Sequence, residues 1–114
     1  MLARKLRRAA ASAVAFEKFL AVAHLTSPFV TIYGQDADDF TKLANPATLP
    51  AGSSYGVAFS ADGTYMAVAH VMSPSVTIYK RSGDTFTKLA NPATLPASHG
   101  FGVAFYPRAF EGPI

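Results

Sequence analysis

Short apolar segments separated by turn residues run along the second half of the chain. Asp62-Gly63 separates the first two segments and Gly83-Asp84 the last two, and Ser73-Pro74 lies between the pairs. Asp-Gly between apolar segments is a strong hairpin signal, because glycine accepts the positive φ that the turn needs. Proline ends a strand, because it cannot donate into the ladder. The pattern predicts four antiparallel strands joined by hairpins, without a helix, at 55–59, 65–71, 76–80 and 85–89.

The inner strands of this predicted unit are apolar on both faces. Met66-Ala67-Val68-Ala69 and Val57-Ala58-Phe59 do not alternate apolar with polar residues, as a strand with one wet face would. Such strands need a cover on each side, and small alanines let a neighbouring sheet approach closely. Phe86-Thr87-Lys88-Leu89 does alternate, as expected for an outer edge strand.

The same pattern occurs twice. Residues 21–59 and 67–105 align with a shift of 46 positions, and 27 of the 39 aligned residues are identical. A fixed period of this length is typical of repeat architectures. The first copy therefore predicts strands at 19–24, 29–33 and 39–43, with a degenerate first strand at 13–16 that echoes Val57-Ala58-Phe59.

The segment GVAFSADGTYMAVAH (56–70) resembles the first hairpin of WD40-like and lactonase-like bacterial β-propellers. VTIYKRSGDTFTKL (76–89) resembles the third and fourth strands of their blades. The resemblance covers about 19–106. It implies an all-β fold of four-stranded antiparallel β-propeller blades, in an incomplete propeller of about two blades plus one extra strand.

The repeat divides the chain into four parts. Residues 1–12 are a basic, Ala- and Arg-rich segment that favours a helix, as either a targeting segment or an N-terminal extension. Residues 13–54 are expected to form the first blade and its connection, and 55–100 the second. Residues 101–114 would hold the first strand of a third blade and a tail. Closed propellers need at least about four blades. We therefore expect either a self-assembling unit that completes a ring or a fragment of a longer protein, and favour the fragment.

Composition and charge narrow the choice of partner. Half of the residues are apolar and 15% are charged, so the chain can form a core. Four of the ten basic residues lie within the first eight positions, and residues 9–114 carry one more acidic than basic group. A basic face for nucleic acid is therefore not expected. No apolar stretch reaches the roughly 18 residues of a membrane span. Without cysteine there is neither a disulfide nor a thiolate metal site.

The two copies differ mainly in their loops, and in a propeller two kinds of loop emerge on one face near the axis. Loops on a rigid scaffold concentrate binding residues. We therefore predict a ligand or partner face formed by His24, Thr26, Ser27, Ser53, Ser54, Tyr55, His70, Ser73, Ser98, His99 and Phe101.

Three features of this sequence resemble catalytic or metal-binding patterns. The paired histidines His24 and His70 suit a metal or a general base, although a recurring strand-end histidine more often hydrogen-bonds the loop of a neighbouring blade. Gly52-Ser53-Ser54-Tyr55-Gly56 matches G-x-S-x-G but lacks the strand–serine–helix context of a nucleophile elbow. Asp36, Asp38 and Asp39 lack the spacing of a calcium loop. We expect no catalytic residue, no metal and no cofactor.

The expected function is a non-catalytic interaction or ligand-binding scaffold, with a protein partner or further copies of the chain. Two alternatives remain open at this point. One is part of a lactonase-like propeller enzyme, which would gather its ligands from several blades. The other is a lectin-like, glycan-binding repeat, for which Tyr55 and Phe101 at equivalent loop positions are the candidate stacking residues.

Overall fold

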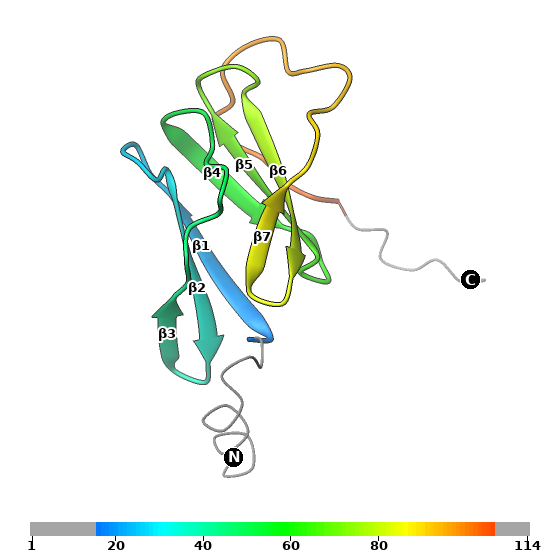
Figure 1. The fold of residues 1–114 in the computed structure, drawn as a ribbon. Coiled ribbons are helices and arrows are strands. Elements are labelled where there is room, and N and C mark those ends of the chain that lie inside the picture. Colours follow the sequence, from blue (N-terminus) through cyan, green and yellow to red (C-terminus); the bar gives the residue numbers. More distant parts are fainter. Residues whose placement is uncertain (1–15, 107–114) are drawn as a thin grey trace, which may run out of the picture.

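The protein forms two antiparallel β-sheets (Figure 1). A computed structural model describes residues 16–106, and within this range there is no helix. The first sheet has three strands in the order β1-β2-β3, and the second has four in the order β4-β5-β6-β7. The strands are β1 (Lys18–Ala23), β2 (Val30–Asp36), β3 (Asp39–Lys42), β4 (Ser54–Phe59), β5 (Tyr65–His70), β6 (Val76–Ser82) and β7 (Thr85–Lys88).

These seven strands confirm the predicted positions to within a few residues, and the two sheets share one pairing register. Leu20 pairs with Tyr33, and the positions 46 residues later, Met66 and Tyr79, pair in the same way. The turn chemistry is also as predicted, because Gly63 and Gly83 have positive φ values of 77° and 61°. Asp62 accepts hydrogen bonds from Thr64 N and Ser60 Oγ, both at 2.9 Å, in the turn between β4 and β5.

The main core lies between the two sheets. Val30 and Ile32 of the first sheet and Met66, Val68 and Tyr79 of the second are buried there. Beside them, the aromatic rings of Phe19, Phe59 and Phe86 meet at centroid distances of 5.8 to 6.3 Å. The Arg81 guanidinium lies 4.7 Å from the Phe19 ring centroid, where a cation is attracted to the ring face. Burial of these apolar side chains is the main driving force that holds the sheets together.

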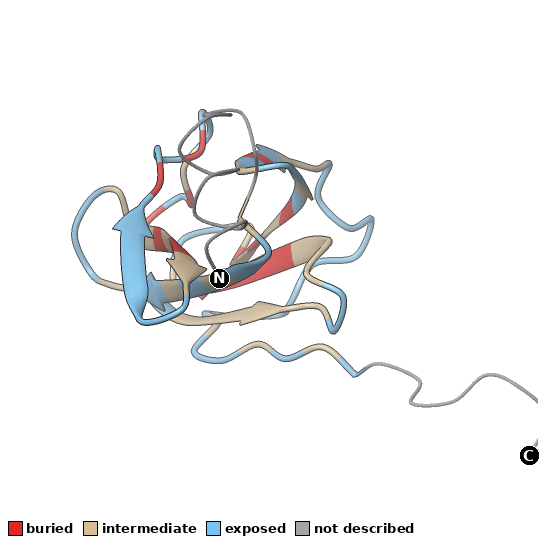
Figure 2. Ribbon diagram, turned by 90° about the horizontal axis from the view of Figure 1, so that it is seen from below, coloured by how far each residue is buried: buried red, intermediate tan, exposed pale blue. Residues whose placement is uncertain are grey.

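The expectation that an inner strand of the second unit is covered on both faces holds for β5, whereas β1, the equivalent strand of the first sheet, has one exposed face. Every residue from Met66 to His70 is buried. In β1 exposure alternates, and Leu20 and Val22 are 44% and 45% exposed. Figure 2 colours the ribbon of the described residues by burial. The difference arises because β5 lies between the first sheet and the segment around Gly100–Val103. No part of the described chain covers the outer face of β1.

The strand expected at 101–105 is not formed. Residues 101–106 belong to no strand, because no described segment lies beside them as a pairing partner. They cross the outer face of the four-stranded sheet instead. A Cβ built on Gly56 would lie 3.0 Å from Gly102 Cα, and one built on Gly100 would lie 3.3 Å from Ala69 Cβ. The absence of a side chain at Gly56 therefore permits this close approach.

The remaining predictions about chain organisation have different outcomes. The segments predicted at 1–12 and 107–114 lie outside the described residues, as do 13–15 of the degenerate first strand. Phe16, the last residue of that strand, belongs to no strand. The described residues form two packed sheets and no closed propeller ring.

Candidate functional site

Four connecting segments gather at one end of the molecule, which is the upper end in Figure 1. They are residues 24–29, 51–55, 70–75 and 97–101. Backbone hydrogen bonds join them in series, because Ser54 N donates to His24 O, Val71 N to Ser53 O and Gly100 N to His70 O. The loops of this end therefore hold one another in place.

The two strand-end histidines brace these loops. His70 is fully buried, and its Nδ1 lies 2.8 Å from Met72 O and its Nε2 2.7 Å from Thr77 Oγ1. A carbonyl can only accept, so Nδ1 carries the proton and Nε2 accepts from the threonine hydroxyl. His24 makes the same pair of contacts, to Thr26 O at 2.9 Å and Thr31 Oγ1 at 2.8 Å.

Burial lowers the pKa of His70, and hydrogen bonds with the backbone of Met72 and Val76 oppose that shift in part. Desolvation disfavours the charged imidazolium, so His70 tends to stay neutral. Both ring nitrogens are already bonded. The geometry therefore agrees with the structural interpretation of this histidine and leaves no free lone pair for a metal or a substrate.

The serines of the 51–55 segment and His99 are also used internally. Ser53 Oγ donates to Leu25 O at 2.8 Å, and the buried Ser54 Oγ donates to Gly52 O at 3.1 Å. His99 Nδ1 donates to Val71 O at 2.7 Å. Ser54 follows a loop and opens strand β4, so the G-x-S-x-G match has neither the exposed hydroxyl nor the following helix of a nucleophile elbow.

Tyr55 and Phe101 form an exposed aromatic pair at this end. Their ring centroids are 5.1 Å apart, and the two side chains are 47% and 62% exposed. A β-bulge between Ser54 and Gly56 leaves Tyr55 without a partner on β5, and bulges of this kind re-aim a side chain. Leu25 and Met72 on the neighbouring loops are 53% and 56% exposed. We call Leu25, Tyr55, Met72 and Phe101 together the loop-end surface.

The structure thus brings together His24, Ser53, Ser54, Tyr55, His70, His99 and Phe101. The other four predicted site residues, Thr26, Ser27, Ser73 and Ser98, are exposed. Their side chains make no hydrogen bond within the described range. They form a polar rim on the loops rather than a converging site.

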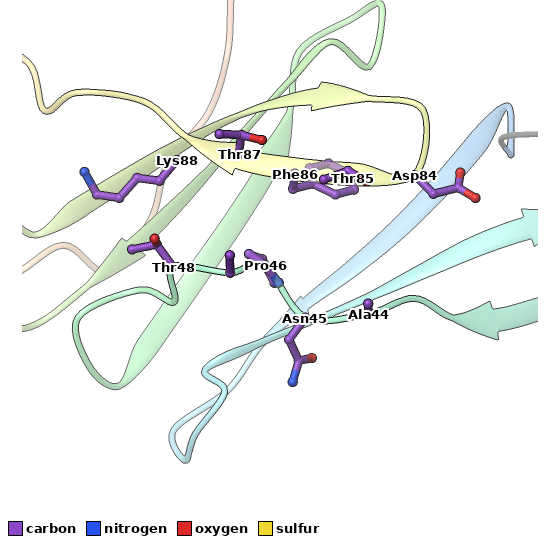
Figure 3. Close-up of a pocket in the computed structure, with 10 residues that line it drawn as sticks. Ala44, Asn45, Pro46, Thr48, Asp84, Thr85, Phe86, Thr87 and Lys88 are labelled. Atoms are coloured by element: carbon purple, nitrogen blue, oxygen red, sulfur yellow. The ribbon is translucent and has the colours of Figure 1, made fainter. Parts of the chain in front are cut away.

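Two pockets formed by the described residues lie away from these residues. One, of about 170 Å³, lies between the 44–48 connection and β7 (Figure 3). Its charged groups are engaged, because Lys88 Nζ donates to Leu89 O and Asn91 Oδ1, and Asp84 Oδ1 accepts from Phe16 N. The other, of about 260 Å³, lies beside the β4–β5 turn. None of the eleven predicted residues lines either pocket.

The described residues contain neither a group of metal ligands nor a helix that could span a membrane. Within residues 16–106, no three His, Asp or Glu side chains lie close enough together to hold a metal ion, and Asp36, Asp38 and Asp39 form no such group. In the same range there is no helix of the length and apolarity required to cross a membrane.

Sequence reasoning missed Thr31, Thr77, Leu25 and Met72. The two threonines carry a signal that was available, since a threonine follows each histidine at a spacing of seven residues. Leu25 and Met72 stand at loop positions that differ between the copies, and only their exposure marks them. Comparison of the chain with protein-family models, with curated proteins and with solved structures finds no match. The interpretation of the site therefore depends on the geometry described above.

Proposed function

We propose that the chain is a propeller-type repeat protein that acts as a non-catalytic scaffold and binds a protein partner through the loop-end surface. The blade assignment is supported by two antiparallel sheets that share one register and pack face to face. It is also supported by the resemblance of 56–70 and 76–89 to propeller blades. Sheets that are apolar on both faces and stacked on one another are typical of that architecture.

The observation that carries the function is the contrast between the base and the surface of the loop end. At the base, beneath the loop-end surface, the polar side-chain atoms of His24, His70 and Ser53 form hydrogen bonds within the protein. At the surface, the four loop-end residues leave large apolar side chains in water. Aromatic residues and methionine are enriched at protein–protein interfaces, where a polar rim surrounds them. A rigid support also lowers the entropic cost of binding.

A glycan is the second candidate partner, and the Tyr55–Phe101 pair specifically favours it. Two exposed rings at 5.1 Å offer apolar faces, and such faces can pack against the C–H face of a sugar ring. A protein partner accounts for Leu25 and Met72 as well, so we place it first.

Selection from a display library of linear peptides against the full chain tests the protein-partner proposal. The double substitution Leu25→Ser/Met72→Ser should weaken a selected peptide about tenfold or more, because central apolar anchors contribute more than 1 kcal/mol each. Phe40→Ser is the matched control, since Phe40 is 49% exposed on β3, at the opposite end. Equal binding by the wild-type protein and the double variant would argue against the proposal. A glycan array probed with wild type and Tyr55→Ser tests the second candidate.

A further inference from the structure

The two sheets differ by one strand. In the four-stranded sheet β4 pairs with β5 through Gly56–Phe59. In the three-stranded sheet β1 is an edge strand, and no described residue pairs with its outer side. Residues 102–105 repeat the sequence GVAF of 56–59 but belong to no strand. The described chain therefore has an edge strand, β1, with no partner on one side. It also has a strand-like sequence, residues 102–105, that belongs to no sheet.

The chain cannot join these two features within itself. Segment 101–105 lies on the outer face of the four-stranded sheet, where Gly102 meets Gly56. The three-stranded sheet packs on the opposite face of that sheet, against Met66 and Val68. The full thickness of a sheet therefore separates 101–105 from β1. Only another copy can bring the two together.

The outer faces of the two sheets are copies of faces that already pack together inside the molecule, and residues 100–103 cover part of the outer face of the second sheet. Within the chain, one face of the first sheet packs against one face of the second. The first set of facing residues, on the first sheet, is Phe19, Ala21, Ala23, Val30 and Ile32. The second set, on the second sheet, is Met66, Val68, Tyr79 and Phe86. The outer face of the second sheet carries Tyr65, Ala67, Ala69, Val76 and Ile78, which match the first set at four of five positions. The free face of the first sheet carries Leu20, Val22, Tyr33 and Phe40, which match the second set at three of four.

We propose that the protein associates head-to-tail with a second copy of itself, repeating between chains the interface that it forms within one chain. Residues 102–105 of one copy add as the fourth strand to β1 of the next. In the β4–β5 register Val57 pairs with Val68 and Phe59 with Met66. The repeat equivalents of Val57 and Phe59 are Val103 and Phe105, and those of Val68 and Met66 are Val22 and Leu20. Val103 should therefore pair with Val22, and Phe105 with Leu20, of the next copy. Addition of a strand to a free sheet edge is a common mode of recognition, because the main chain supplies the hydrogen bonds.

Two details of the structure agree with this pairing. Val103 and Phe105 are half-buried against the sheet, whereas Gly102 and Ala104 are exposed. Val57 and Phe59, their equivalents in β4, likewise pack against the core between the sheets. Tyr79 Oη donates to Thr48 O at 2.7 Å across the internal interface, so Tyr33 should donate to Thr94 O of the preceding copy.

The proposed contact joins two different surfaces, so it builds a closed ring or an open chain rather than a two-fold dimer. The head-to-tail contact does not depend on the proposed function. Only the number of copies in a ring rests on it, through the propeller-type fold. With two sheets from each chain, a propeller of four to eight blades holds about two to four copies.

Disulfide trapping tests the register in the full chain, which has no native cysteine. Single variants Val22→Cys and Val103→Cys are mixed under oxidising conditions. Directly paired residues on adjacent strands lie within the range that a disulfide spans, so a cross-linked dimer should form in the mixture and not in either variant alone. Ala23→Cys mixed with Val103→Cys is the off-register control and should not link, because neighbouring strand positions face opposite sides of the sheet.

Three outcomes would overturn the proposal. A link in Val22→Cys alone would indicate a symmetric edge-to-edge dimer. An intrachain link in Val14→Cys/Val22→Cys would mean that residues 13–16 of the same chain occupy the edge. A monomeric mass by light scattering at every concentration would exclude association. If wild type is larger than a monomer, Ala104→Pro should reduce its mass and Ala104→Ser should not. Ser60 N donates to Tyr65 O, so the next hydrogen-bonded pair of this antiparallel ladder is Ala58 with Ala67, and proline at the equivalent Ala104 removes a donor.

The outcome of the trapping experiment does not depend on whether the proposed function is correct. It needs no external partner, and its cysteines lie outside the loop-end surface. The Leu25→Ser/Met72→Ser background should weaken peptide binding about tenfold or more while the Val22–Val103 link still forms. Loss of the link with peptide binding intact would overturn the head-to-tail contact alone.

Discussion

Buried polar side chains at the loop end are satisfied by neighbouring hydroxyls and carbonyls. His70 and Thr77 are 0% and 1% exposed and bond each other at 2.7 Å. Within residues 16–106, no buried side-chain nitrogen or oxygen lacks a hydrogen-bond partner. Such a network stabilises one arrangement of the loops, since a half-satisfied one would be costly.

The lowered pKa of His70 predicts a dependence of stability on pH. The unfolded chain binds a proton near the ordinary pKa of 6.5, whereas the folded protein resists protonation. The contribution of His70 to folding should therefore be complete above pH 6.5 and decrease as the pH falls below it. Urea unfolding at pH 5 to 8 measures this trend. His70→Gln should show a flatter profile, and identical slopes in both proteins would contradict the assignment.

At the scale of elements, the β2–β3 and β6–β7 hairpins have the same left-handed turn position but different residues in it. The turn between β6 and β7 contains Gly83 with φ 61°, and the turn between β2 and β3 contains Ala37 with φ 56°. Both residues are left-handed, and only glycine adopts that conformation without a steric penalty. The first hairpin therefore stores strain that the second avoids.

Exchanging these residues should change stability in opposite directions. Ala37→Gly should raise the free energy of unfolding by up to about 1 kcal/mol, and Gly83→Ala should lower it by about 1 to 2 kcal/mol. Chemical denaturation of both variants beside wild type measures the effects. A loss of stability in Ala37→Gly would show that the turn does not adopt the left-handed conformation.

The strand positions were predictable because turn chemistry and apolar pattern are local properties. Neither the burial of a strand nor the pairing of 102–105 is local. Val22 and Val68 stand in the same AVAH motif, yet one is 45% exposed and the other 0%. GVAF forms a strand at 56–59 and none at 102–105, because a strand exists only beside a partner. Within the site, hydrogen bonding by the strand-end histidines was predicted, but to the loop of a neighbouring blade, whereas His70 bonds Met72 and Thr77 of its own unit. The bulge that turns Tyr55 outward depends on register between strands.

At the scale of the molecule, the interface between the sheets is the main source of cohesion, and equivalent residues have unequal shares in it. Phe86 is 3% exposed and its ring meets Phe19 edge-on at 5.8 Å. Phe40 occupies the equivalent position in the first sheet and is 49% exposed. The same residue type thus contributes to the core in one sheet only.

Alanine substitutions at this pair should separate folding from association. Phe86→Ala should lower the free energy of unfolding by about 3 to 5 kcal/mol, because it leaves a cavity in the core. Phe40→Ala should change it by less than about 1 kcal/mol, when measured under dilute conditions. Equal losses would mean that the free face of the first sheet is buried in the isolated chain.

The position of 101–106 outside every strand has a consequence for shortened chains. In the proposed head-to-tail association, a product that ends before Phe101 would keep the β1 edge and could still accept the segment of an uncut chain. It would offer no segment of its own to the next molecule. If the proposed association takes place, such a product would act as a chain terminator, and a small proportion of it would limit the size of the assembly that uncut chains form.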